Sequence, residues 1–247
     1  MLDYMKVILI SAGLCMSWSG VADPDYDDEL EIIAEGGRIY DKWWAEYGLK
    51  EPSSTHPSYP SAGKKKGAAT WRCKECHGWD YRGRQGVYGK GSHFTGIGGI
   101  DVYAGRDPAM IVNILKNRIH RYDEVMLDYG LMRVAMFVSR GQVDISQHLN
   151  MKTNKVKGDI RRGEQIFKKT CKECHGRDGR ARNFKDEKNP EYIGTVANKN
   201  PWEAIHKLRN GHPGAFVMGE PMPNMNEVIS FDDQINLLSY LQTLPEK

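Results

Sequence analysis

Two copies of the motif Cys-x-x-Cys-His constrain this chain more than any other feature. The motif residues are Cys73, Cys76 and His77 in the first copy and Cys171, Cys174 and His175 in the second. Two thiols three positions apart lie on one face of a helical turn, so both can bond to one edge of a flat ring system. The histidine that follows is then placed to bind a metal at the centre of that ring. Each copy predicts a covalent c-type haem with the histidine as proximal iron ligand.

A lone Cys-x-x-Cys pair is also compatible with a redox dithiol or with half of a zinc site. Here both copies carry the same Lys-Glu insert, and a glycine follows each. Of the five cysteines, only Cys15 lies outside the motifs, and it belongs to the leader described next. No cysteine is left for a structural disulfide, and we expect two haem c groups.

The first residues are typical of an export signal. A short region with Lys6 as its only base precedes a mostly apolar run at 7–16, which is too short to span a bilayer. The stretch Gly20-Val21-Ala22 offers small residues at the expected cleavage positions. Residues 1–22 are therefore predicted to be a signal peptide that is cleaved after Ala22; the alternative is an uncleaved N-terminal anchor. Leu14 precedes Cys15 where a lipidation motif needs a small residue. The net charge of +3 argues against a nucleic-acid partner. We expect an exported protein with no membrane span after cleavage.

The surroundings of the two motifs repeat. A helix start with glycine and an aromatic residue precedes each motif, and a glycine-rich loop follows it. A helix led by proline comes next, and an apolar helix closes each half. The proline-led helices are expected at 108–117 and 201–210, and the closing helices at 131–138 and 235–241. Ser230 is a predicted N-cap of the last helix, and Pro245 a predicted stop.

This order resembles the class I cytochrome c fold over nearly all of the chain after the leader. The resemblance implies an all-α protein of two tandem class I cytochrome c domains, each a small helical fold around one covalent haem. The expected parts are an N-terminal domain at 23–140, a linker at 141–158 and a C-terminal domain at 159–247. The family's close crossing of first and last helices implies Gly163 against Tyr240, and Gly36 or Gly37 against Phe137.

The first half carries an insertion at about 41–70. It contains Trp43 and Trp44, a Pro/Ser-rich stretch at 52–60 and the lysines Lys64, Lys65 and Lys66. This segment is either a solvated loop over an aromatic patch or a docking surface for a redox partner, steered by the lysines.

The distal iron ligands decide what each haem can do. In the second half, Met222 stands before Pro223 in a loop that looks like the distal-ligand loop of class I cytochromes; Met225 and Met218 are rivals. The first half lacks such a Met-Pro pair. There, counting back from Phe137 reaches His120, nearly the position that Met222 holds relative to Tyr240.

Other residues remain open as the first distal ligand. They are Met126, Met132 and His93, of which His93 lies in a segment resembling the proximal loop. The other histidines, His56, His148, His206 and His212, are expected to be ordinary surface or loop residues.

The sequence favours a periplasmic electron carrier. It would pass electrons from a dehydrogenase or bc-type donor to a terminal oxidase or reductase, running from the N-terminal haem to the C-terminal haem. The alternatives are a dihaem oxidoreductase of sulfur compounds, a dihaem peroxidase, or a haem subunit of a larger redox enzyme. Enzymes resembling thiosulfate dehydrogenase use a cysteine as distal ligand, and here every cysteine after the leader belongs to a motif.

Overall fold

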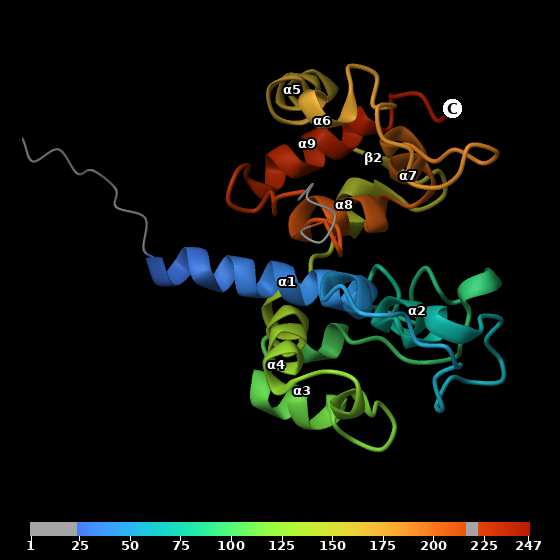
Figure 1. Cartoon of the computed structure of the whole chain (residues 1–247). Helices are drawn as coiled ribbons and strands as arrows, with labels where there is room; N and C mark the ends of the chain where they lie inside the picture. Colours follow the sequence, from blue (N-terminus) through green and yellow to red (C-terminus); the bar gives the residue numbers. More distant parts are fainter. Residues whose placement is uncertain (1–23, 216–221) are drawn as a thin grey trace, which may run out of the picture.

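The computed structural model describes residues 24–215 and 222–247, and it is predominantly helical (Figure 1). The expected signal peptide at 1–22 and Met218 lie outside the described residues. The helices are α1 Pro24–Glu46, α2 Cys73–His77, α3 Pro108–Leu115, α4 Asp128–Met136, α5 Ile160–Ile166, α6 Lys172–His175, α7 Ile193–Lys199, α8 Pro201–Asn210 and α9 Phe231–Leu241. One hairpin joins strands β1 Leu149–Asn150 and β2 Lys155–Val156. Within the described ranges, no helix is long and apolar enough to cross a membrane.

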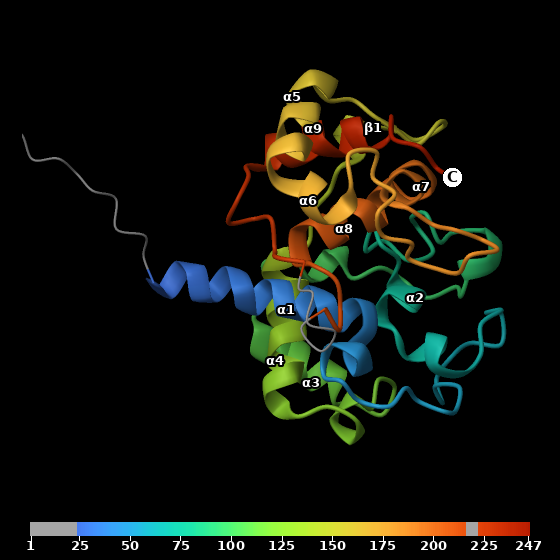
Figure 2. The ribbon, with the colours of Figure 1, turned by 45° about the horizontal axis from the view of Figure 1, so that its top comes forward.

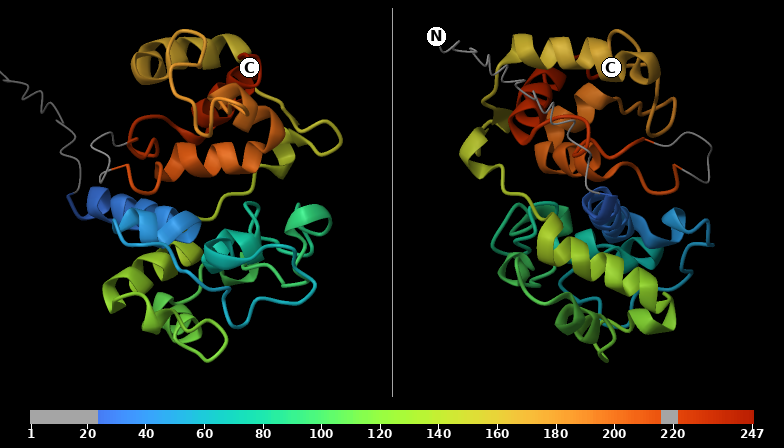
Figure 3. Two further views of the ribbon diagram at one scale, coloured as in Figure 1. Left: turned by 45° about the vertical axis from the view of Figure 1, so that its right-hand side comes forward. Right: turned by 90° about the vertical axis from the view of Figure 1, so that its left-hand side faces the viewer.

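The helices pack around two hydrophobic cores. Helices α1, α3 and α4 enclose the first core, and α5, α7, α8 and α9 contribute to the second. Helix α1 lies between the two groups, with α4 on one side and α8 on the other (Figures 1 and 3). This mostly helical arrangement agrees with the expected all-α class, apart from the small hairpin and an isolated β-bridge between Gly83 and Gly98.

The expected close helix crossings are confirmed in both halves. In the first, α1 crosses α4, and a Cβ on Gly36 would overlap the carbonyl oxygen of Arg133 and crowd Phe137. In the second, α5 crosses α9, and a Cβ on Gly163 would overlap the carbonyl of Asn236 and crowd Tyr240. Gly37 faces the other way, against Asn210 of α8.

Local capping chemistry explains where several helices begin. Asp107 accepts from the backbone of Ala109 at the start of α3, and Asn200 accepts from Glu203 at the start of α8. In both helices a proline follows the cap, where its missing N–H costs nothing. The predicted N-cap Ser230 accepts from the backbone N–H of Asp233.

The segment expected to link the two halves contributes to the second core. Ile145, Leu149 and Val156 are buried there, and the Gln242 side chain bonds to the backbone of both Val156 and Asn154. The hairpin is therefore packed against the body of the second half.

Replacing Gly163 by alanine tests the second helix crossing. Alanine alone favours a helix over glycine by up to about 1 kcal/mol, so without the crossing the change would stabilise the protein. Because the new Cβ meets the α9 backbone, we expect Gly163→Ala to lower the free energy of unfolding by about 1–3 kcal/mol in urea titrations. The exposed neighbour Arg161 is the control, and Arg161→Ala should change it by less than about 0.5 kcal/mol. A stabilised Gly163→Ala protein would contradict the crossing.

Candidate functional site

The first motif opens onto an apolar cavity of about 420 Å³. Cys73, Cys76 and His77 lie in its wall, together with aliphatic side chains such as Ile111 and Leu115. Tyr40 of α1, Val134 of α4 and Val138 of the π-helical turn that follows α4 also line it. The volume is in the range of cofactor sites, and most of the lining is apolar.

His77 and His120 face each other across this cavity. Their ring centroids are 6.4 Å apart, and the ring planes differ by 24°. Two imidazoles that bind one metal from opposite sides have centroids about 6 Å apart, since each metal–nitrogen bond is about 2 Å and each ring centre lies about 1 Å behind its nitrogen. The two side chains therefore fit the axial positions of one haem.

Hydrogen bonds hold both imidazoles in place. His77 Nδ1 donates to the carbonyl of Gly98 (2.9 Å), and a carbonyl oxygen only accepts, so Nε2 of His77 carries the lone pair. The His120 ring is held by the backbone of Ile114, and its Nδ1 lies 3.3 Å from the side-chain oxygen of Asn117. Burial lowers the pKa of His77 to about 4 and lowers that of His120. Both rings are thus neutral at pH 7, and a second hydrogen bond of this kind is typical of histidine ligands.

The two thiols of the first motif are buried, which makes their deprotonated forms unfavourable. Burial raises the pKa of Cys73 to about 11 and that of Cys76 to about 12. The Cys73 thiol donates to the Tyr122 hydroxyl (3.9 Å), which in turn donates to the carbonyl of Trp71 (2.8 Å). The pair is therefore a poor exchanging dithiol, which agrees with thiols that form thioether bonds.

The alternatives to His120 lie elsewhere. Met126 is buried in the first core, and Met132 is 40% exposed on α4. His93 is bonded to Glu75 (2.9 Å) and stacked on Tyr88. None of the three methionine and histidine alternatives lines the cavity.

The second motif is built differently. A single π-helical turn, Phe167–Cys171, continues α5 into α6 and so delivers Cys171, Cys174 and His175. Cys174 is exposed and Cys171 half-buried; burial raises the pKa of Cys171 to about 11 and lowers that of His175. The buried Nδ1 of His175 has no hydrogen-bond partner within the described part of the chain. The set of two thiols and one imidazole fits a haem c.

Two methionines of the distal loop lie in different surroundings. Met222 is half-buried against the second core, and its backbone oxygen lies over Gly211 at the end of α8. Met225 is 4% exposed inside that core, and its backbone N–H donates to the carbonyl of Leu208. Met225 is therefore a residue of the second core, and Met222 remains the predicted distal ligand of the second haem.

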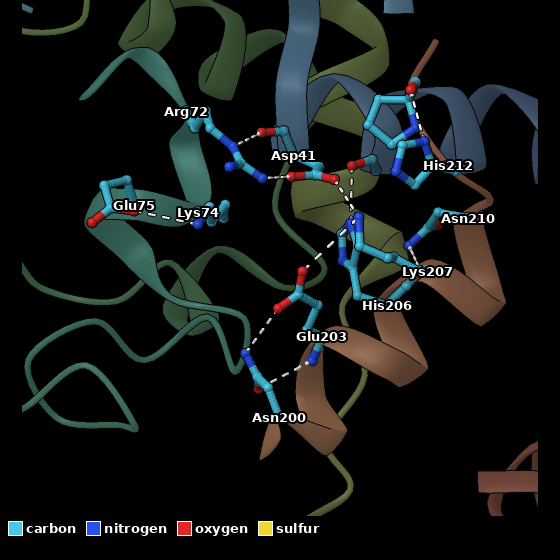
Figure 4. A network of polar contacts seen from close by, with 12 residues as sticks. Asp41, Arg72, Lys74, Glu75, Asn200, Glu203, His206, Lys207, Asn210 and His212 are labelled. Atoms are coloured by element: carbon cyan, nitrogen blue, oxygen red, sulfur yellow. Dashed lines mark hydrogen bonds and ion pairs between the residues drawn. The ribbon is translucent and has the colours of Figure 1, made fainter. Parts of the chain in front are cut away.

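A buried carboxylate joins the first motif to the second core (Figure 4). Asp41 of α1 is 1% exposed and forms ion pairs with Arg72, which precedes Cys73, and with Lys207 of α8 (2.8 Å). These two cations hold the pKa of Asp41 well below its usual range despite the cost of burial. The motif and α8 are thereby fixed relative to α1.

The two Lys-Glu inserts lie in opposite environments. Lys74 and Glu75 are buried at this interface, and Lys74 and Lys207 both approach the ring of Trp79, at 5.3 and 5.6 Å. Trp79 itself belongs to the second core. In contrast, Lys172 is partly exposed and Glu173 is exposed. Identical sequences thus serve an interface in the first half and a surface in the second.

His206 corrects one expectation from the sequence. It was predicted to be an ordinary surface or loop residue, but it lies on α8 against α1 and is 1% exposed. Its Nε2 donates to the carbonyl of Gly37 (3.0 Å), and its Nδ1 accepts from the Tyr81 hydroxyl (3.0 Å). Burial lowers its pKa to about 4.

The inserted segment divides into a buried and an exposed part. Trp43 and Trp44 lie in α1 and belong to the first core, whereas Lys64 and Lys66 are exposed. Figure 2 shows the chain after α1 passing beside α2. His56, which was expected to be an ordinary surface or loop residue, does lie in a loop of this segment, but it is buried and lines the cavity.

Comparison with known proteins finds one similarity, in the second half. Residues 158–241 match the family model of cytochrome c oxidase, cbb3-type, subunit III. No curated protein and no solved structure matches the chain. The match supports a c-type cytochrome, that is, a domain that binds haem c covalently and exchanges electrons with redox partners. It spans the second motif and leaves the first outside.

Replacing Asp41 by asparagine tests the interface. At pH 7, Asp41→Asn should lower the free energy of unfolding by about 3 kcal/mol, because Arg72 and Lys207 lose their shared partner. The pKa of Asp41 is depressed in the folded protein. Its contribution is therefore complete above the unfolded-state pKa of about 4 and is lost as the pH falls further. The difference from the wild type should shrink in urea titrations below about pH 4.

The exposed Asp232 is the matched control for this change. Asp232→Asn should alter the free energy of unfolding by less than about 0.5 kcal/mol at either pH. Equal losses for the two variants at pH 7 would show that the interface does not depend on Asp41.

Proposed function

We propose that this chain is a dihaem c-type cytochrome that carries electrons in the periplasm. The first haem would be bonded to Cys73 and Cys76, with His77 and His120 as axial ligands. The second would be bonded to Cys171 and Cys174, with His175 and Met222. The observation that carries the proposal is the pair of neutral imidazoles facing each other across an apolar cavity beside two thiols.

The proposed ligands favour electron transfer over catalysis. Haem c, when bound, supplies an iron that changes between two oxidation states. With a protein ligand on each side, the iron would have no open position for a substrate, and the cavity beside it is mostly apolar. The Gly98 carbonyl and Asn117 contact the two imidazoles and would restrain them, so little rearrangement should accompany the change.

The difference between the two ligand sets gives the protein a direction. A methionine ligand raises the reduction potential of a haem relative to a second histidine. Electrons would therefore pass from the first haem to the second. The buried contacts of Asp41 and His206 support a fixed arrangement of the two halves, which suits transfer over a constant distance.

Partners and location follow from the leader and the charges. A signal peptide at 1–22 would export the chain, and the exposed Lys64 and Lys66 would help to dock an acidic redox partner. The donor would be a dehydrogenase or bc-type complex, and the acceptor a terminal oxidase or reductase. A sulfur-oxidising activity is not supported, because every cysteine of residues 23–247 lies in a motif.

A redox titration of the full chain tests the two unequal haems. Haem quantification should give two haems per chain. The titration should resolve two midpoints separated by on the order of 0.1 V, part of the about 0.8 V range that axial ligands cover. One haem per chain, or two equal midpoints, would contradict the proposal.

The distal ligand of the second haem is tested separately. Methionine ligation of oxidised haem gives a weak absorption band at the red edge of the visible spectrum. Met222→Ala should remove this band and lower the higher of the two midpoint potentials. Met225→Ala should keep the band, but it should lower the free energy of unfolding by about 2–5 kcal/mol because it truncates a core side chain. Loss of the band in Met225→Ala alone would assign the ligand to Met225.

A further inference from the structure

His56 stands out in the inserted segment of the first half. Among residues 45–69, all of which the structure describes, it is the only buried one. We propose that His56 is a positioning residue that holds the His120 loop over the first haem. The proposal rests on the proposed function, in which His120 is an axial ligand.

The hydrogen bonds of His56 determine its tautomer. Its Nδ1 accepts from the backbone N–H of Ser58 (3.1 Å), so this nitrogen carries no proton. Its Nε2 therefore carries the proton and donates to the carbonyl of His120 (2.9 Å). A neutral His56 in this single tautomer satisfies both contacts.

The His56 ring is anchored to the chain that leads into the first motif. It packs edge-on against Trp71, with ring centroids 4.4 Å apart. The backbone N–H of His56 donates to the Thr70 hydroxyl (2.8 Å), and the Trp71 indole N–H donates to the carbonyl of Ser54 (2.8 Å). Cys73 lies two residues after Trp71. His56 thus connects the cysteine side of the cavity to the distal side.

The loop that carries His120 needs such a restraint. The Asn117 side chain bonds to the backbone N–H and the ring of His120, which fixes the residue from one side. The next residue, Arg121, has φ +54°, a left-handed conformation that is unfavourable for a residue with a side chain. Conformations of this kind persist where surrounding contacts over-determine them. His56 supplies the contact on the carbonyl side.

The hydrogen bond from His56 to the His120 carbonyl also gives the inserted segment a role besides docking. The second half has no segment of this length before its motif, because Phe167–Cys171 runs directly into the second motif. A ligand loop tied to the motif side opens less often, so the iron of the first haem is less accessible to outside molecules.

Carbon monoxide binding to the reduced, haem-loaded full chain tests the proposal, since the gas can bind only when a distal ligand leaves. His56→Phe keeps a ring against Trp71 and removes the donor, whereas His56→Gln keeps a donor and removes the ring. An unsatisfied carbonyl should raise the population of the open loop, and with it the binding rate, roughly fivefold to a hundredfold in His56→Phe. His56→Gln should stay within about threefold of the wild type. The midpoint of the first haem should shift in His56→Phe alone.

Two further variants separate the possible failures. His148 packs on Phe231 in the second half, so His148→Phe is the control and should bind carbon monoxide as the wild type does. His120→Ala should open the first haem fully; if it does not, the ligand assignment in the proposed function fails. If His120→Ala opens the haem and His56→Phe binds carbon monoxide at the wild-type rate, the role of His56 is overturned. Should His56→Phe fail to fold, His56→Asn, too short to reach the His120 carbonyl, carries the same expectation and the same contrary outcome.

Discussion

Close approach of two helix backbones, made possible by a glycine, shapes each half of this protein. Gly36 lets α1 approach α4, and Gly163 lets α5 approach α9, where any side chain would overlap backbone atoms. In the first half the crossing has a direct consequence for the site. Tyr40 on α1 and Val134 on α4 form part of the cavity wall, so the packed pair of helices supports the space in which the two imidazoles meet. The packing of α1 against α4 therefore supports the cavity that His77 and His120 line.

The two halves use the same motif in different surroundings. In the first, the motif is buried against α8, and Arg72 beside it shares the carboxylate of Asp41 with Lys207. In the second, Cys174 is exposed and no comparable contact of its Lys-Glu insert is buried. Desolvation and fixed charges act on the first site more strongly than on the second. Together with the different distal ligands that we propose, this asymmetry would give a physical basis for two unequal haems.

Features set by local sequence could be predicted, whereas contacts between distant segments could be predicted only where the resemblance to class I cytochrome c implied them. The cap at Ser230 depends on neighbouring residues, the glycine crossings were implied by that resemblance, and the structure shows both. His120 was found by its offset from Phe137, which the repeat supplies. The burial of His206 and His56 arises from contacts between parts far apart in the chain, namely α1 with α8 and the insertion with the His120 loop. Neither histidine has a neighbouring motif that would have indicated its surroundings.

The central claim is that two haems are bound with different axial ligands, histidine–histidine and histidine–methionine. Near-infrared magnetic circular dichroism of the oxidised full chain tests it most directly, because the energy of the low-spin charge-transfer band depends on the pair of axial ligands. The account predicts two bands of similar intensity, one typical of bis-imidazole ligation and one typical of imidazole–thioether ligation. A single band, or a high-spin signal from the first haem, would contradict the facing arrangement of His77 and His120 as axial ligands.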